Sequence, residues 1–183
     1  EKGEAMIYGA LGVAEFQLAN YAAGLEWQFK ALRLREKLND SHGRSAAYTN
    51  LALNYNAMHK NVEAMRCLDS SMSIKKRIGD KKGLIAVHNN RGIVFEDMGE
   101  EVLALHEYEE ALRLSLELKD KMGESYAYNN LGNSYAQLGR FPKALENFKA
   151  SLEIKRETGD LGLIGACYNN IGQVYLEYGN LDL

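Results

Sequence analysis

The sequence predicts an all-α protein in which pairs of helices stack into a solenoid. Three observations predict this fold class. One short pattern recurs every 40 residues along the 183-residue chain, apolar residues inside each copy follow the period of a helix, and no stretch shows the alternation and turn signals of strands. A fixed period of this size indicates supersecondary units that bury their apolar faces against their neighbours.

The recurring pattern is "YTNLALNY" at 48–55, "HNNRGIVF" at 88–95, "YNNLGNSY" at 128–135 and "YNNIGQVY" at 168–175. A degraded fifth copy, "YGALGVAE", stands at 8–15. The lack of strand signals excludes the WD-repeat propeller, which has a similar period. We therefore interpret residues 1–183 as a single array, with repeats at about 1–39, 40–79, 80–119 and 120–159 and a partial repeat at 160–183.

Each repeat begins with a helix whose apolar residues recur at i, i+3, i+4 and i+7, as Tyr128, Leu131, Gly132 and Tyr135 do. We expect these four residues to form the packed face of this helix. Gly139 follows, where a left-handed residue can end the helix.

A second helix completes each repeat. Pro142 stands where this helix can start, because proline fits the first turn of a helix, which needs no amide donor there. The apolar residues of the second helix then follow the same rule as those of the first, at Ala144, Leu145, Phe148 and Leu152.

The junction between repeats reads "GD" at 79–80 and 159–160. Glycine there predicts the left-handed end of one helix, and aspartate predicts an N-cap that accepts the free amides of the next. The same register holds for Asp40, Asp80, Asp120 and Asp160.

Composition excludes several classes of protein. With 46% hydrophobic residues the chain can bury a core, and its formal charge of -3 favours neither nucleic acid nor an anionic membrane. No apolar run is long enough to span a membrane, and the first residues resemble neither an initiator Met nor a signal peptide, so we expect an excised soluble fragment. Cys67 and Cys167 lie far apart without Cys or His neighbours at ligand spacing, which favours reduced, structural cysteines in a cytoplasmic protein and no metal site.

The motif Tyr128-x2-Leu131-Gly132-x2-Tyr135, followed by Ala144-x3-Phe148, resembles the tetratricopeptide signature Trp-x2-Leu-Gly-x2-Tyr and Ala-x3-Phe, with Tyr in place of Trp. The usual period is about 34 residues. The longer repeat, with Leu-Gly-Asn in the first helix, resembles the arrays of Pins/LGN adaptors, kinesin light chains and bacterial sensor and regulatory proteins. His88, Arg91 and Glu15 depart from the motif.

This resemblance implies a right-handed superhelical solenoid of antiparallel helix pairs with about four and a half repeats. In such arrays the first helices line a concave groove that holds an extended peptide or a partner helix. The angle between helical positions then places a cluster of polar side chains toward this groove, opposite the packed face. The groove residues we predict are Asn50, Asn56, Asn89, Asn90, Glu96, Tyr126, Asn129, Asn130, Asn133, Gln137, Asn169, Asn170 and Gln173.

Two interpretations of the asparagines remain open. An amide both donates and accepts hydrogen bonds, so it can pair with the backbone of a peptide, and this favours ligand contact for Asn89, Asn129, Asn133 and Asn169. The column Asn50, Asn90, Asn130 and Asn170 instead favours amides that bridge neighbouring helices. Glu96, Asp97 and Glu177 would suit a peptide with Lys or Arg, although solvated charges are the more frequent meaning of such residues.

The sequence favours a protein-protein interaction scaffold without catalysis or cofactor. No nucleophile or carboxylate arrangement recurs together with the four histidines, and helical spacing gives none of them a metal partner; they are His42, His59, His88 and His106. No set of acid, base and nucleophile is present. The groove lacks the Lys and Arg with which chaperone-binding members of the family clamp a terminal carboxylate. The alternative is a sensor segment of a larger signalling protein, such as a kinase or a transcription regulator, that packs on its own parent.

The last helix of the sequence should offer an uncovered apolar face. Leu176 and Tyr178, with Ile171 and Tyr175, have no following residues that correspond to Ala144, Leu145 and Phe148. Apolar surface of this kind tends to find a partner, so we expect self-association or fraying from about residue 165 onward.

Overall fold

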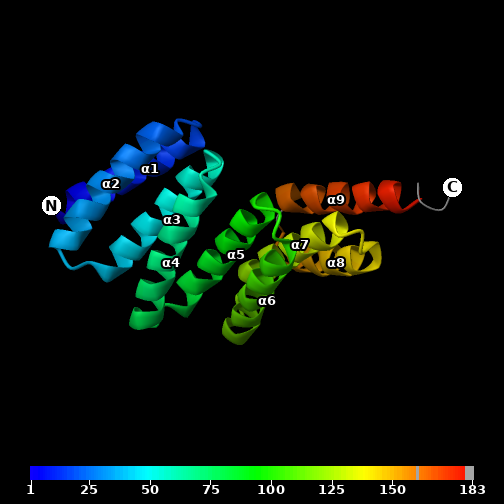
Figure 1. Cartoon of the computed structure of the whole chain (residues 1–183). Coiled ribbons are helices and arrows are strands. Elements are labelled where there is room, and N and C mark those ends of the chain that lie inside the picture. The colour runs from blue at the N-terminus through cyan, green and yellow to red at the C-terminus, as the bar shows by residue number, and fades with distance from the viewer. Residues whose placement is uncertain (160, 180–183) are drawn as a thin grey trace.

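The computed structural model describes residues 1–159 and 161–179, and every regular element in these ranges is a helix (Figure 1). The all-α prediction is therefore confirmed. The helices are α1 (Lys2–Gln17), α2 (Tyr21–Lys37), α3 (Ser41–Ala57), α4 (Asn61–Ile78), α5 (Lys81–Asp97), α6 (Glu101–Leu118), α7 (Lys121–Gln137), α8 (Phe141–Thr158) and α9 (Leu161–Gly179).

The helices form two layers that follow the chain from its N-terminal to its C-terminal end (Figure 1). Each helix packs on the next one in sequence. The odd-numbered helices also contact one another in turn, α1 with α3, α3 with α5, α5 with α7 and α7 with α9, whereas the even-numbered helices make no such contacts within the described residues. In a curved stack the layer whose members touch is the inner one, so the odd-numbered helices line the inner face of the solenoid.

The predicted aspartate caps are confirmed at three junctions. Each carboxylate accepts a hydrogen bond from the backbone amide three residues later, which satisfies one of the free donors at a helix start. The pairs are Asp40 with Gly43 (2.9 Å), Asp80 with Gly83 (2.8 Å) and Asp120 with Gly123 (3.2 Å). Asp160 lies outside the described residues.

A left-handed residue stands near the end of each helix from α1 to α8. Glycine occupies four of these positions, as the sequence predicts for Gly79, Gly139 and Gly159, and α8 begins at Phe141 with Pro142 in its first turn, as expected. The other four carry side chains, although this conformation is strained for any residue with a Cβ atom. The eight positions recur every 20 residues, at Ala19, Asn39, His59, Gly79, Gly99, Lys119, Gly139 and Gly159.

Small residues on the inner helices let large side chains of the outer helices pack against the backbone. A Cβ atom at Gly132 would lie 2.6 Å from the ring of Phe148, and one at Gly92 would lie 2.3 Å from the ring of Tyr108. Both rings are fully buried. This close approach is why the second half of the Leu-Gly motif must be small.

The tyrosines of the motif are less buried than expected. Tyr128 and Tyr135 are only half-buried, and they border a shallow hollow of about 270 Å³ on the outer side of the α7–α8 pair. The ammonium of Lys143 lies 5.3 Å from the centre of the Tyr135 ring. The fully buried aromatic residues are instead Tyr108 and Phe148, which the even-numbered helices supply.

The two departures from the motif in the third repeat belong to one buried network of charges. His88 Nδ1 lies 2.6 Å from one carboxylate oxygen of Glu107, and Arg91 Nε donates to the other at 2.8 Å. Arg91 also pairs with Asp69 of α4. The network therefore joins α5 to α6 and to the preceding repeat.

Glu107 is charged in this network. Burial alone would raise its pKa, but the hydrogen bonds from His88 and Arg91 and the charge of Arg91 outweigh burial and hold the pKa of Glu107 below the ordinary value of 4.5. A lowered pKa in the folded state means that the carboxylate contributes its full stability above pH 4.5 and loses it as the pH falls through the lowered pKa.

We predict that Glu107→Ala lowers the free energy of unfolding by about 3 to 5 kcal/mol, because it leaves the buried guanidinium of Arg91 without its main partner. Urea unfolding at pH 7 measures the loss. The same experiment at a pH acidic enough to protonate this carboxylate in the folded wild type should show a smaller difference between the two proteins.

A triple variant provides the control. His88→Tyr, Arg91→Leu and Glu107→Cys together restore the residues of the preceding repeat, Tyr48, Leu51 and Cys67. Replacing a whole buried ion network with apolar residues is often neutral or stabilising, so this variant should be at least as stable as the wild type. A triple variant as unstable as Glu107→Ala would contradict this account.

Candidate functional site

Two pairs of asparagines connect successive helices of the inner layer. Asn130 Nδ2 of α7 donates to Asn89 Oδ1 of α5, and Asn170 Nδ2 of α9 donates to Asn129 Oδ1 of α7, both at 3.3 Å. We call these two pairs the asparagine ladder. The predicted bridging role of Asn130 and Asn170 is therefore confirmed.

The ladder leaves hydrogen-bond donors free. Asn89 and Asn129 each use their amide oxygen to accept the ladder bond, and their NH₂ groups have no partner among the described residues. Both side chains are partly exposed. An asparagine of this kind can hold two helices together and still donate to a ligand.

The ladder does not continue into the second repeat. Thr49 occupies the position of Asn89 and Asn129, and its hydroxyl bonds to the carbonyl of Ser45 and to the hydroxyl of Ser71 in α4. The side chain of Asn90 therefore has no asparagine on α3 with which to form a ladder hydrogen bond. The backbone carbonyl of Asn50 accepts from Asn54, a buried residue of the same helix.

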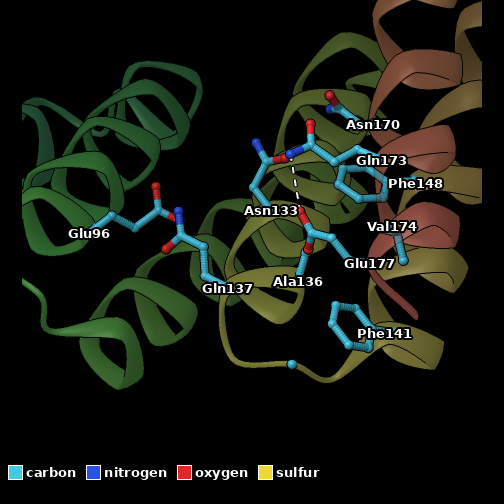
Figure 2. A pocket seen from close by; sticks show the side chains of 11 residues that line it. Glu96, Asn133, Ala136, Gln137, Phe141, Phe148, Asn170, Gln173, Val174 and Glu177 are labelled. Carbon is cyan, nitrogen blue, oxygen red and sulfur yellow. Dashed lines mark hydrogen bonds between the residues drawn. The ribbon is translucent and has the colours of Figure 1, made fainter. Parts of the chain in front are cut away.

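A cleft of about 560 Å³ opens at the C-terminal half of the inner face, between α5, α7, α8 and α9 (Figure 2). Its polar lining comes from amide and carboxylate side chains of the odd-numbered helices, and its apolar lining comes mainly from α8 and α9. Five predicted residues lie here, Glu96, Asn133, Gln137, Asn170 and Gln173. The remaining lining residues are Ala136, Gly139, Phe141, Phe148, Val174 and Glu177.

Glu96 is fixed at one side of this cleft. Tyr108 donates to one carboxylate oxygen at 2.9 Å, and Ser134 of the following repeat donates to the other. Burial raises the pKa of Glu96 above its ordinary value, with the hydrogen bonds from Ser134 and Tyr108 offsetting part of the rise. On the opposite side, Gln173 donates to Glu177 at 3.1 Å, the dashed line in Figure 2.

The N-terminal half of the inner face is less polar. A hollow of about 50 Å³ is lined by Gly12, Val13, Phe16, Asn50, Leu53 and Asn54. A second hollow, of about 20 Å³, lies one repeat further on and includes Asn56, Asn90 and Ile93. The amide oxygen of Asn56 is buried there without a partner, because Val94 stands where Ser134 meets Glu96 in the later repeat.

Five predicted residues line none of these hollows, and three of them, Asn89, Asn129 and Asn130, belong to the asparagine ladder. The other two are Tyr126 and Asn169. Tyr126 is 45% exposed. Asn169 is exposed and has no hydrogen-bond partner among the described residues. Sequence reasoning also missed the apolar lining of the large cleft, since Phe141, Phe148 and Val174 were assigned to packing or not considered. The repeat register could have identified Val13, which shares a position with Leu53 and Ile93.

Among the described residues, no cluster of three His, Cys, Asp or Glu side chains could hold a metal ion. Across the same residues, no helix is both long and apolar enough to cross a bilayer. Cys67 and Cys167 are free thiols, and burial raises the pKa of Cys67 to about 11.

Stacked helix pairs with an open inner groove define a helical-repeat protein. A model of the tetratricopeptide repeat family matches residues 44–117 and 123–183. The chain therefore belongs to the tetratricopeptide repeat family, whose fold is typically a non-catalytic interaction module. No curated protein matches the chain closely enough to serve as a relative.

Solved structures share the fold at low sequence identity. BtubC (BKLC) from P. vanneervenii is 19% identical with a TM-score of 0.82, over 96% of this chain and 73% of its own. A Rap protein complexed with Competence and Sporulation Factor is 18% identical with a TM-score of 0.84, and the match covers 98% of this chain and 50% of the Rap protein. A STAND protein from Pyrococcus horikoshii with a tetratricopeptide repeat sensor is 21% identical with a TM-score of 0.82, over 96% and 27%. The chain thus spans half or less of the last two proteins.

We predict that Asn130→Ala is less stable than Asn133→Ala by about 1 kcal/mol, the net value of a hydrogen bond. Both variants remove an asparagine from α7, so they gain the same helix propensity, but only Asn130 donates to a neighbouring helix. Thermal unfolding followed by circular dichroism gives the difference. Equal stabilities would mean that the ladder does not contribute to the stacking of repeats.

Proposed function

We propose that the chain is a non-catalytic protein-interaction scaffold that holds an extended peptide or a partner helix along the odd-numbered helices. The observation that carries this proposal is the cleft of about 560 Å³, in which amides from α7 and α9 surround an apolar floor. Pockets of this size with a few convergent polar groups are the usual form of binding sites.

The chemistry of the cleft suits a peptide backbone. Asn133 and Gln137 make no hydrogen bond to any described residue, so their amides are available as donors and acceptors for successive peptide groups. Each such bond contributes about 0.5 to 1.5 kcal/mol net, so useful affinity requires several repeats to act together. The free NH₂ groups of Asn89 and Asn129 extend the same surface toward the middle of the array.

The proposal includes a cytoplasmic location and no cofactor. The cytoplasmic location is supported by Cys67 and Cys167, two free thiols that lie in different helices. A second candidate function is a sensor segment of a larger signalling protein. The similarity to the sensor repeats of the Pyrococcus horikoshii protein supports this alternative, since this chain covers only 27% of that protein.

Selection from a library of displayed random dodecapeptides tests the proposed groove. We predict that the selected peptides bind the triple variant Asn133→Ala, Gln137→Ala and Gln173→Ala at least tenfold more weakly than the wild type, because up to three amide contacts are lost. Fluorescence anisotropy measures both affinities.

A variant outside the groove is the control for this selection. Asn20→Ala with Asn147→Ala removes two amides that bond only to residues nearby in sequence. Asn20 donates to Glu15, and Asn147 donates to the carbonyl of Lys143. This variant should bind the selected peptides like the wild type. If no peptides are enriched, or if the triple variant binds them unchanged, the groove is not the binding site.

We also propose that the 183-residue chain self-associates through α9. Leu176 is 71% exposed, Tyr175 51% and Tyr168 49%, whereas Tyr128 and Tyr135 at the matching positions of α7 are half-buried. Tyr178 is partly covered by the ring of Phe141 at 5.7 Å. A second copy of the chain is the partner that is always present at high concentration.

Light scattering tests this proposal. We predict that the apparent mass rises with concentration for the wild type and stays that of a monomer for Tyr175→Ser with Leu176→Ser, which removes exposed apolar surface. The control is Val62→Ser, at a residue that is 57% exposed on α4. A wild type that remains monomeric at high concentration would refute the proposal.

A further inference from the structure

The two halves of the groove differ in chemistry at equivalent positions. The residue one turn after the Asn89 and Asn129 column is apolar in the first three repeats and carries an amide in the last two. The five residues are Val13, Leu53, Ile93, Asn133 and Gln173. Val13 is 39% exposed and Ile93 37%, so both present apolar surface at the inner face.

The N-terminal half of the groove has no charged lining. The hollow beside Val13 and Phe16 is closed by Leu53 and by the glycine backbone at Gly12, and its polar residues, Asn50 and Asn54, are uncharged. The next hollow contains Ile93 and Asn56 and is also uncharged. Apolar groups of a ligand could pack over these small hollows without burying a charge.

The C-terminal half of the groove is acidic. Glu96 and Glu177 face the large cleft, and none of its lining residues is cationic. Three further carboxylates, Asp97, Glu100 and Glu101, lie within the next five residues of the sequence. The charges of the lining would therefore repel a ligand carboxylate and attract a cation.

The floor of the cleft suits the stem of a long cationic side chain. Phe141, Phe148 and Val174 supply apolar surface on the side of the cleft where Glu177 lies, and Glu96 stands on the other side (Figure 2). Lys and Arg place their methylene groups on apolar surface while the charged end reaches polar groups. Glu96 is held in place by Tyr108 and Ser134, and each of its oxygens keeps a lone pair to accept from a cation.

We infer that the groove takes an extended peptide of two-part character, with apolar side chains over α1, α3 and α5 and a Lys or Arg side chain in the cleft between α5, α7 and α9. This inference rests on the proposed function and specifies the ligand class of the same groove. Charge complementarity in the cleft fixes which end of the ligand is basic relative to the array.

The dodecapeptide selection described above also tests this inference, because the composition of the enriched peptides is read by sequencing. We expect Lys or Arg enriched at one end and aliphatic residues at the other. On Glu177→Gln the basic enrichment should weaken, and on Glu96→Gln with Glu177→Gln it should disappear, while the aliphatic enrichment remains on both. On Ile93→Thr the aliphatic enrichment should weaken while the basic enrichment remains.

Affinities give the second readout. A peptide selected on the wild type should bind Glu177→Gln about fivefold more weakly at low salt, and the difference should shrink at high salt. Replacing its basic residue with norleucine should weaken binding to the wild type by a larger factor than binding to Glu177→Gln, which keeps only the Glu96 carboxylate in the cleft. The control pair Glu26→Gln with Glu109→Gln removes two exposed carboxylates from α2 and α6 and should change neither readout.

The outcomes separate this inference from the proposed function. Peptides that bind through the groove amides but show no basic preference, or an acidic one, overturn the inference and leave the scaffold in place. A selection without groove-dependent peptides overturns both. Because Glu177 is exposed and has only Gln173 as a partner among the described side chains, its variant should fold even if the Glu96 variant does not.

Discussion

The stack depends on one constraint, the close approach of each inner helix to the outer helix that follows it. At Gly132 and Phe148, and at Gly92 and Tyr108, a ring lies against backbone with no room for a Cβ atom. The second repeat reaches the same packing with a smaller pair, Ala52 and Leu68, both fully buried. The sizes compensate in these three repeats, so each of them buries the large side chain of its outer helix against a small residue of its inner helix.

The asparagines of the inner layer bridge neighbouring helices and also keep donors unpaired, two properties that the sequence analysis treats as alternatives. Asn130 and Asn170 donate across to the preceding inner helix, and the residues that accept, Asn89 and Asn129, keep their own NH₂ groups free. A poor helix former is tolerated here because its amide finds a partner in the next helix rather than in its own backbone. The ladder therefore stabilises the stack and orients donors along its inner face.

The sequence predicts most of the fold and only part of the site. The repeat period and capping aspartates give the helix pairs, since these features are local. The burial of Tyr128 and Tyr135 is overestimated, because a helical period identifies a face without telling which edge of it the neighbouring helix covers. The left-handed conformations at Ala19, His59 and Lys119 have no signal in their residue types. The apolar floor of the cleft is missed for a similar reason: Phe148 packs on Gly132 and also borders the cleft, and one residue with two neighbours cannot be assigned from spacing alone.

The internal repeats provide their own comparison between packing and recognition. Positions that hold helices together change little from one repeat to the next, as in the buried series Gly24, Ala64, Ala104 and Ala144. Where a packing position does change, its neighbours change with it, as His88, Arg91 and Glu107 do in the third repeat. Inner-face positions vary more widely, and only some of their changes are matched by neighbours, as Glu96 is by Tyr108 and Ser134. The series Phe16, Asn56, Glu96, Ala136 and Leu176 runs through apolar, amide and acidic side chains at one place in the repeat. The inner face therefore changes its chemistry from repeat to repeat while the buried positions keep theirs, and a ligand of the proposed groove would meet a different surface on each repeat.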